Sequence, residues 1–233
     1  MTITDPHDPQ LRQVPLLRTR KGRERSGLFA VEGEDLVAAA SAAGREPVHL
    51  FAAKGSGLPG IAVEQAVLDG VSALGSGTRT IGVYEQAWDE PAGPLAVALW
   101  GVGDPGNVGT VVRSAMAFGA SSVLLGPGCA DPHGPKAARA SMGAIFGLPM
   151  ARIDSLEEMP GTIVALVARS GEGLGSGGWP AGELTILVGG ERDGLPPELV
   201  AGAGQVRHIP IAGDSLNAAV AASIALYAAA GRV

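Results

Sequence analysis

A glycine-rich turn in the middle of the chain is the first segment whose residue types could do chemistry. Its glycines at 101, 103 and 106 form the pattern G-x-G-x-x-G after the apolar run 95–100. Such a turn after a strand can hold the pyrophosphate of a dinucleotide. Here Pro105 removes a backbone N–H from the motif, and residues 123–129 lack the acidic ribose ligand expected about 20 positions on. The turn alone is therefore weak evidence for a dinucleotide site.

The helix predicted after this turn, residues 107–118, carries a candidate catalytic side chain. Its apolar residues recur at helical spacing and form one buried stripe, namely Val108, Val111, Val112, Ala115 and Met116. We expect Asn107 to be the N-cap and Gly119 to end the helix. Arg113 lies off the stripe, one turn beyond Gly109, so it projects near the glycine-bearing end of the helix. Taken by itself, this arginine would be interpreted as an ordinary surface residue.

The composition indicates a globular protein. The chain has 233 residues, of which 46% are hydrophobic, enough for a substantial core. Cys129 is the one cysteine, so no internal disulfide can form, which favours a reducing compartment. The first ten residues lack the apolar core of a signal peptide, and no apolar run is long enough to cross a bilayer. We therefore expect a soluble cytoplasmic protein without a membrane partner, and, because Cys129 and His133 are too few ligands for zinc, no metal site.

A basic segment near the N-terminus is a candidate contact for nucleic acid. The net charge of −6 argues weakly against such a partner. Residues 12–25, however, hold six basic side chains against one acidic side chain, Glu24. This cluster could neutralise several phosphates. A solvated, mobile arm explains the same charge equally well, so both interpretations stay open.

Alternating strand and helix patterns divide the chain into two α/β halves. The first half, about residues 11–85, is predicted to contain strands at 27–33, 48–53 and 78–85 and helices at 33–44 and 63–74. A linker at 87–94 with two prolines follows. In the second half the strands are continuous apolar runs, as expected for parallel strands buried on both faces. We expect these strands at 95–100, 121–126, 162–168, 184–189 and 206–211, with helices at 107–118, 135–146, 196–203 and 215–230.

The final predicted helix, residues 215–230, is apolar on nearly all sides, so it should be buried on most faces. Its many alanines permit another helix to approach closely. A homodimer interface is the preferred interpretation of this helix, and burial within one subunit is the alternative.

Three separated segments resemble the motifs of one enzyme family. Residues 104–120 (DPGNVGTVVRSAMAFGA) resemble the first motif of the SpoU/TrmH family of RNA ribose methyltransferases, which belongs to the SPOUT class. Residues 187–196 (LVGGERDGLP) are similar to its second motif, and residues 209–227 (IPIAGDSLNAAVAASIALY) to its third. Residues 135–149 are similar to the family's middle segment. The basic stretch 20–37 resembles the start of its N-terminal substrate-binding domain.

The resemblance implies an α/β fold with two domains. Residues 1–88 would form a small ribosomal-protein-like domain that binds the RNA substrate, and residues 94–233 a methyltransferase domain in which a parallel sheet lies between helices and contains a deep trefoil knot. The implied activity is that of a homodimeric enzyme that transfers a methyl group from S-adenosyl-L-methionine to a ribose 2′-hydroxyl of RNA. Ribosomal RNA is favoured over tRNA. The alternatives are a tRNA 2′-O-methyltransferase, a non-catalytic RNA-binding protein with the same fold and, more distantly, an NAD-dependent oxidoreductase.

The resemblance also assigns site residues to this sequence. The catalytic positions correspond to Asn107, Arg113, Glu191, Ser215 and Asn217. The cofactor contacts, made largely by backbone groups, correspond to Gly189, Ile209 and Leu216. The basic cluster offers the expected RNA contacts Arg18, Arg20, Lys21, Arg23 and Arg25.

Residue chemistry refines these roles. The resemblance casts Arg113 as the base, but a guanidinium stays protonated, so we expect it to bind phosphate and stabilise the developing alkoxide. A neighbouring phosphate could share the proton. Glu191 is expected to orient Arg113 or Asn107, with a carboxylate near the N-terminus of the following helix as the alternative. Ser215 is expected to be the N-cap of the final helix and to face the site. Asn217 would then lie in the first turn, where its poor helix propensity suggests a second role.

Overall fold

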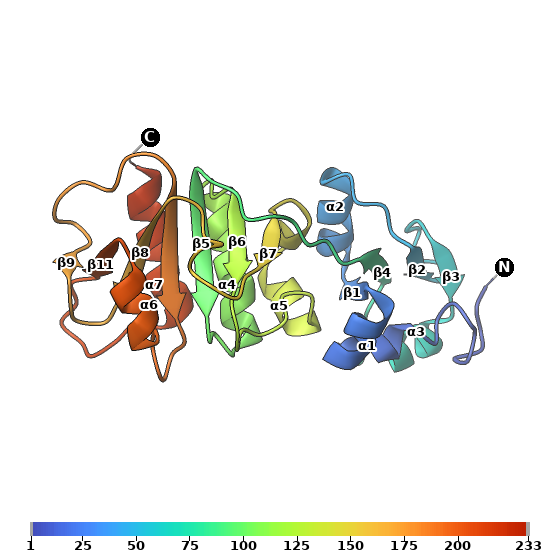
Figure 1. Cartoon of the computed structure of the whole chain (residues 1–233). Helices are drawn as coiled ribbons and strands as arrows, with labels where there is room; N and C mark the ends of the chain where they lie inside the picture. Colours follow the sequence, from blue (N-terminus) through green and yellow to red (C-terminus); the bar gives the residue numbers. More distant parts are fainter. Residues whose placement is uncertain (1, 232–233) are drawn as a thin grey trace. The chain divides into compact units, whose positions relative to one another are not determined.

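The chain divides into two compact units in the computed structural model, which describes residues 2–231 (Figure 1). The first unit contains residues up to Gln86 together with Asp131–Gly147, and the second contains Ala87–Ala130 together with the residues from Leu148 onward. A segment from the middle of the sequence thus belongs to the N-terminal unit, which the sequence did not predict. The domain limits 1–88 and 94–233 stay predictions.

The first unit is built on a four-stranded mixed sheet with the order β1-β4-β2-β3. Both β1 and β2 run antiparallel to β4, whereas β3 runs parallel to β2. Its strands are β1 (Leu28–Glu32), β2 (His49–Ala53), β3 (Ile61–Val63) and β4 (Thr80–Glu85), and its helices include η1 (Val14–Arg18), α1 (Arg20–Ser26), α2 (Glu34–Ala42) and α3 (Gln65–Val71). The predicted strands around β1, β2 and β4 and the two predicted helices are confirmed, but β3 was not predicted.

The segment from the middle of the chain adds two short helices to the first unit. These are α5 (Pro135–Ala140) and η2 (Ala144–Phe146). The single helix predicted over 135–146 is therefore wrong. Met142 and Gly143 adopt positive φ angles of 49° and 89°, which an α-helix cannot contain, so the helix is interrupted there.

The second unit contains a seven-stranded parallel sheet with the order β7-β6-β5-β10-β8-β11-β9. Its strands are β5 (Leu95–Trp100), β6 (Ser122–Leu125), β7 (Met150–Arg152), β8 (Thr162–Val167), β9 (Glu172–Gly173), β10 (Leu184–Gly189) and β11 (Gln205–His208). The five predicted strands are confirmed, with β11 ending three residues earlier than predicted. The short strands β7 and β9 were not predicted.

Strands β5 and β10 lie side by side at the centre of this sheet, although they are far apart in the sequence. They pair in register from Leu95 opposite Leu184 to Trp100 opposite Gly189. Strand order proceeds through β6 and β7 on one side of this pair and through β8, β11 and β9 on the other. Loops diverge at such a reversal, and ligands of parallel sheets bind there, outside the carboxyl ends of the strands.

Helix α4 (Pro105–Ala117) begins two residues earlier than predicted, and Asn107 is not its N-cap. Asp104 caps it instead: its carboxylate accepts hydrogen bonds from the N–H groups of Gly106 at 2.7 Å and Asn107 at 3.1 Å. Pro105 takes the first helical position, where its missing N–H costs nothing. Because Asp104 supplies the cap, the side chain of Asn107 is available for other contacts.

Helix α7 (Ala218–Ala230) begins later than predicted, so Ser215 is not its N-cap and Asn217 does not lie in its first turn. Asn217 is the N-cap: its Oδ1 accepts hydrogen bonds from the N–H groups of Ala219 at 2.9 Å and Val220 at 3.2 Å. The propensity argument for Asn217 therefore fails, because asparagine is a preferred N-cap residue. A third helix of the unit, α6 (Pro197–Gly202), follows β10.

Candidate active site

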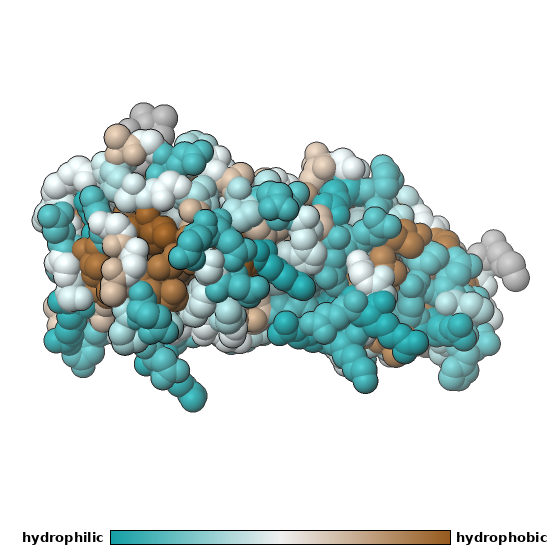
Figure 2. Space-filling model, in the orientation of Figure 1, coloured by the Kyte–Doolittle hydropathy of each residue, from teal (hydrophilic) through white to brown (hydrophobic). Residues whose placement is uncertain are grey.

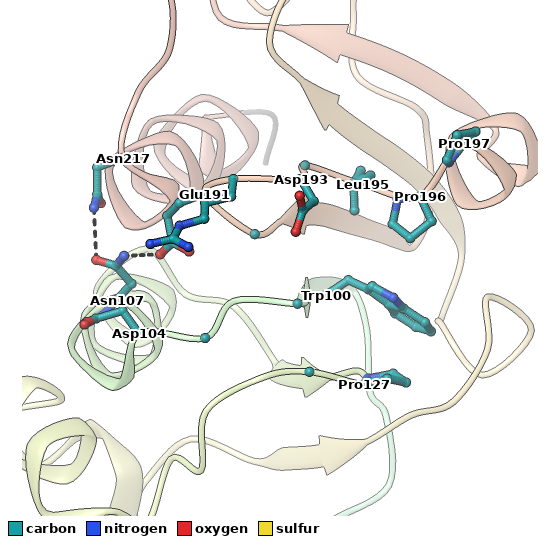
Figure 3. Close-up of a pocket in the computed structure, with 16 residues that line it drawn as sticks. Trp100, Asp104, Asn107, Pro127, Glu191, Asp193, Leu195, Pro196, Pro197 and Asn217 are labelled. Atoms are coloured by element: carbon teal, nitrogen blue, oxygen red, sulfur yellow. Dashed lines mark hydrogen bonds between the residues drawn. The ribbon is translucent and has the colours of Figure 1, made fainter.

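Three polar side chains from separate segments meet at the carboxyl edge of the parallel sheet (Figure 3). Asn107 lies in the first turn of α4, Glu191 follows β10, and Asn217 begins α7. Nδ2 of Asn107 donates a hydrogen bond to Oε1 of Glu191. Nδ2 of Asn217 donates one to Oδ1 of Asn107 at 3.1 Å. We call these three residues the cleft cluster.

The cap of α7 determines how both amides of the cleft cluster are oriented. Since Oδ1 of Asn217 accepts from two backbone N–H groups, its Nδ2 must face outward as a donor. Asn107 must then present its Oδ1 to this donor, which directs its own Nδ2 at the carboxylate of Glu191. One helix cap thereby fixes the position of a carboxylate on another segment.

The cleft cluster lines a cavity of about 1190 Å³. The walls come from the loops after β5, β6 and β10, and they include Trp100 and Asp104. Neither residue was predicted to belong to the site. Their positions at and just beyond the carboxyl end of a central strand are the signal that could have identified them.

A second cavity, of about 510 Å³, contains the predicted cofactor positions. Gly189, Ile209 and Leu216 all line it, as does Ser215. The structure thus brings these four residues together, although Ser215 does not have the capping role expected of it. Their elements are the end of β10 and the loop between β11 and α7.

The two cavities share one wall, formed by residues 190–195. At Gly189 and Gly190, where this wall begins, the backbones approach so closely that a side chain is excluded. A Cβ on Gly189 would lie 2.3 Å from the carbonyl carbon of Gly194, and one on Gly190 would lie 2.3 Å from the carbonyl oxygen of Gly101. The exposed side chains of Glu191, Arg192 and Asp193 lie in this wall, and their charges sum to −1.

Arg113 is the one predicted catalytic residue that lines neither of these cavities. Its side chain is exposed on α4. It follows Asn107 by six residues, which is roughly 9 Å along the helix axis and about 120° around it. Within one copy of the chain the structure therefore does not bring Arg113 into the cleft cluster.

Comparisons with known proteins agree with this arrangement. Residues 94–227 match the family model of the SpoU rRNA Methylase family, and residues 8–89 match that of the MRM3-like substrate binding domain. The chain belongs to the SpoU rRNA methylase family. Its predicted fold class, a parallel α/β methyltransferase domain preceded by a substrate-binding domain, is confirmed at this level. The trefoil knot stays a prediction.

Relatives of this SpoU-family protein match over nearly its full length. The 23S rRNA (guanosine(2553)-2′-O)-methyltransferase RlmP of Bacillus subtilis is 30% identical over 91% of this chain and 92% of its own length. The AdoMet-bound rRNA methyltransferase of Sinorhizobium meliloti is 30% identical, with a TM-score of 0.87 over 98% of this chain and 97% of that one. The SpoU methyltransferase AviRb of Streptomyces viridochromogenes, in complex with the cofactor AdoMet, is 25% identical, with a TM-score of 0.84 over 97% and 98%.

Cys129 of this SpoU-family protein is partly buried and hydrogen-bonded to the backbone, which indicates a structural role. Its Sγ donates a hydrogen bond to the carbonyl oxygen of Leu99 at 3.2 Å, and burial raises the pKa of the thiol. A thiol held protonated is a poor nucleophile and a poor metal ligand. Within residues 2–231, no group of three or more His, Cys, Asp or Glu side chains is placed to hold a metal ion. In the same residues no helix has the length and apolar character needed to cross a membrane.

The predicted RNA contacts of the first unit separate into exposed and buried residues. Arg18, Arg20, Lys21 and Arg25 are exposed, and the surface over α1 is largely hydrophilic in Figure 2. Arg23, by contrast, is only 4% exposed. Its guanidinium pairs with Asp131 at 2.7 Å and donates to the carbonyl oxygen of Leu17 at 2.8 Å. The assignment of Arg23 to RNA binding is therefore wrong, because its donors are already used inside the unit.

Asp131 is the centre of this buried arrangement. Burial by itself would raise the pKa of Asp131, but hydrogen bonds from His133 and the charge and hydrogen bonds of Arg23 hold it well below its usual range. The His133 ring also packs edge-on against Phe29, with centroids 4.8 Å apart. We call Arg23, Asp131 and His133 the buried ion-pair cluster. It attaches the segment 131–147 to the rest of the first unit.

Proposed function

We propose that this protein transfers a methyl group from S-adenosylmethionine to a ribose 2′-hydroxyl of RNA, and that the RNA is ribosomal. One observation carries the proposal: the cleft cluster and the predicted cofactor positions line two cavities that share a single wall. Because the two cavities adjoin along this wall, a methyl donor bound in one would lie next to an acceptor oxygen bound in the other. The rRNA methyltransferase relatives, which match both units of the chain, support ribosomal RNA over tRNA.

The smaller cavity has the properties that S-adenosylmethionine requires. Its volume of about 510 Å³ lies within the usual range for small-molecule sites. Its lining combines backbone groups, which can pair with an adenine edge, with apolar side chains such as Leu166 and Val188. Glu191, Arg192 and Asp193 together give the lining a net charge of −1, which favours a positively charged sulfonium. When bound, S-adenosylmethionine supplies an activated methyl group.

The cleft cluster would position the ribose in the larger cavity. One oxygen of Glu191 accepts the hydrogen bond of Asn107, and the second can accept one from the 2′-hydroxyl. This contact would hold the nucleophilic oxygen in place, and its proton would pass to the carboxylate of Glu191 or to a neighbouring substrate phosphate. Asn217 keeps Asn107 oriented, and Asn107 keeps the carboxylate aimed. Ser215, in the neighbouring cavity, is a hydroxyl that can contact the donor.

A homodimer would give Arg113 a place in this scheme. Helices α4 and α7 pack together, with Ser114 Oγ and Ser223 Oγ 2.7 Å apart. Met116, which was predicted to belong to the buried stripe of α4, is 51% exposed, so that prediction is wrong for this residue. The other apolar side chains that the two helices expose are Val220 (47%), Ile224 (37%) and Tyr227 (69%). Arg113 lies one turn before Met116, at the margin of this surface. A second copy docked there would bring Arg113 to the interface, where it can bind a substrate phosphate.

The first test is methyl transfer to RNA isolated from a strain that lacks the gene. Tritiated S-adenosylmethionine and the purified protein should label ribosomal RNA, and mapping of 2′-O-methyl sites should identify one nucleotide. Labelling confined to tRNA would replace the rRNA assignment with the tRNA alternative. Calorimetry with S-adenosylmethionine tests the non-catalytic alternative, because an RNA-binding protein that merely retains the fold need not bind it.

Arg113→Ala tests the predicted role of this arginine. We expect methyl transfer to be abolished, while S-adenosylmethionine affinity, thermal stability and the oligomeric state remain those of the wild type. Removal of one charge-stabilising donor typically lowers a rate by about 10²–10³-fold. Arg139→Ala, a variant in the first unit, is the matched control. Retained activity in the tritiated-methyl assay would remove Arg113 from the site.

A further inference from the structure

The larger cavity has two chemically different ends (Figure 3). At one end lies the cleft cluster of two amides and a carboxylate. The other end is apolar and is formed by Trp100, Pro127, Leu195, Pro196 and Pro197. A nucleotide has the same division, because its ribose carries hydroxyl groups and its base presents a flat, weakly polar face.

Trp100 is held firmly at the apolar end. It is the last residue of β5 and pairs with Gly189 of β10, so its backbone belongs to the centre of the sheet. Its indole lies directly against the backbone of Gly126: a Cβ on that glycine would be 2.4 Å from Cε3 of the ring. Trp100 and Leu195 are partly buried and pack on the core cluster that contains Leu124. The ring is therefore a fixed wall of the cavity and needs no ordering when a ligand arrives.

We propose that Trp100 is the stacking platform for the base of the nucleotide whose ribose is methylated. This inference rests on the proposed function and adds the way in which the target nucleotide is held. Single-stranded RNA bases splay out and stack on aromatic side chains, whatever the base, because each base has a π-face. Stacking at Trp100 would place the ribose of that nucleotide at the cleft cluster. The nucleotide would therefore bind unpaired, since a paired base is covered by its neighbours in the helix.

The test compares two losses, that of the indole and that of the base. The substrate is an RNA fragment that contains the mapped nucleotide, prepared once with its base and once as an abasic ribose at that position. The proteins are the wild type, Trp100→Phe and Trp100→Leu, which keeps apolar bulk but has no ring. Steady-state methylation yields kcat and KM for each combination, and thermal unfolding reports whether each variant is folded.

If Trp100 stacks on the base, Trp100→Leu lowers kcat/KM on the normal fragment by about 10- to 100-fold, and Trp100→Phe by much less. The abasic fragment costs the wild type a similar factor. For Trp100→Leu, the abasic fragment gives a kcat/KM only slightly below that of the normal fragment, because the indole that stacks on the base is already absent. Trp179→Leu, which removes a tryptophan outside both cavities, leaves methylation unchanged.

Two results would overturn the proposal. One is a Trp100→Leu variant that folds and methylates the normal fragment like the wild type. The other is a loss on the abasic fragment that is equally large in wild type and Trp100→Leu, since independent effects multiply. A wild-type protein that methylates no RNA would instead refute the proposed function, so the two failures can be distinguished.

Discussion

The buried ion-pair cluster and the cleft cluster join segments that are similarly distant in the sequence, yet they differ in what surrounds them. Arg23 and Asp131 are 108 residues apart, their side chains are only 5% and 12% exposed, and each satisfies the charge of the other. Asn107 and Glu191 are 84 residues apart and border an open cavity. A buried charge is destabilising unless it is paired and hydrogen-bonded, whereas amide and carboxylate groups beside a cavity keep unused donor or acceptor sites for a ligand. The first cluster therefore stabilises a unit, and the second is available for binding.

The largest expected effect concerns the buried ion-pair cluster. Arg23→Ala leaves the carboxylate of Asp131 buried without its cationic partner, so we expect the first unit to lose about 3–5 kcal/mol of unfolding free energy. The exposed pair of Arg20 with Glu24 is a matched control on the same helix, and Arg20→Ala should change stability by no more than about 1 kcal/mol. Urea unfolding measures both. An Arg23→Ala protein with wild-type stability but weakened RNA binding would restore the original assignment of Arg23.

The next effect concerns the cleft cluster. Glu191→Gln keeps the shape of the side chain and an acceptor for Asn107 but removes the negative charge. We expect methyl transfer to fall by about 10²–10³-fold with little change in stability, because the group is exposed and its charge acts on the substrate. Glu157→Gln, at an exposed carboxylate outside both cavities, is the control. If Glu191→Gln lowered the free energy of unfolding enough to account for its loss of activity, Glu191 would be a structural residue like those of the buried ion-pair cluster.

Local sequence patterns predicted most elements of the fold, because long helices and buried strands carry their own periodicity. They failed where the element is too short to show a pattern, as in β7 and β9. Local patterns also could not predict which strands are neighbours in the sheet. Strand β5 pairs with β10 through residues that are 89 positions apart, and no local pattern encodes such a contact. These long-range contacts also bring the site residues together, so local patterns could not identify the site. Its residues were predicted from the family resemblance instead, and Trp100, which lies outside the matching motifs, was missed.

The two wrong helix caps have different causes. Pro105 favours the first position of a helix, which makes the preceding Asp104 the N-cap, so the sequence held the signal for α4. For α7, Ser215 and Asn217 are both good N-cap residues, so residue type alone could not show that the helix begins after Asn217. Arg23 was misassigned because charge patterns do not reveal burial; its partner Asp131 is brought to it by the tertiary fold.

A smaller effect tests how the cap and the cleft cluster are linked. Asn217→Ala removes the N-cap of α7 and should cost about 1 kcal/mol of stability. Asn217→Asp keeps acceptors for the two N–H groups but has no donor for Asn107, so stability should stay near that of the wild type. Asn107 would then turn its Nδ2 toward the new carboxylate and lose its hold on Glu191. We therefore expect both variants to lose about tenfold in methyl transfer. Full activity in Asn217→Asp would show that the orientation of Asn107 does not matter.

The smallest effect sharpens the comparison within α1, where exposed Lys21 lies two residues before buried Arg23. Lys21→Ala should leave stability unchanged and weaken RNA binding only a few-fold. It should also reduce the slope of log affinity against log salt by about 1, because one phosphate contact and its released counterion are lost. Lys54→Ala, at an exposed lysine outside α1, should leave that slope unchanged. If both variants behaved alike, the basic residues of α1 would have no special role in binding RNA, and the substrate surface of the first unit would have to be sought elsewhere.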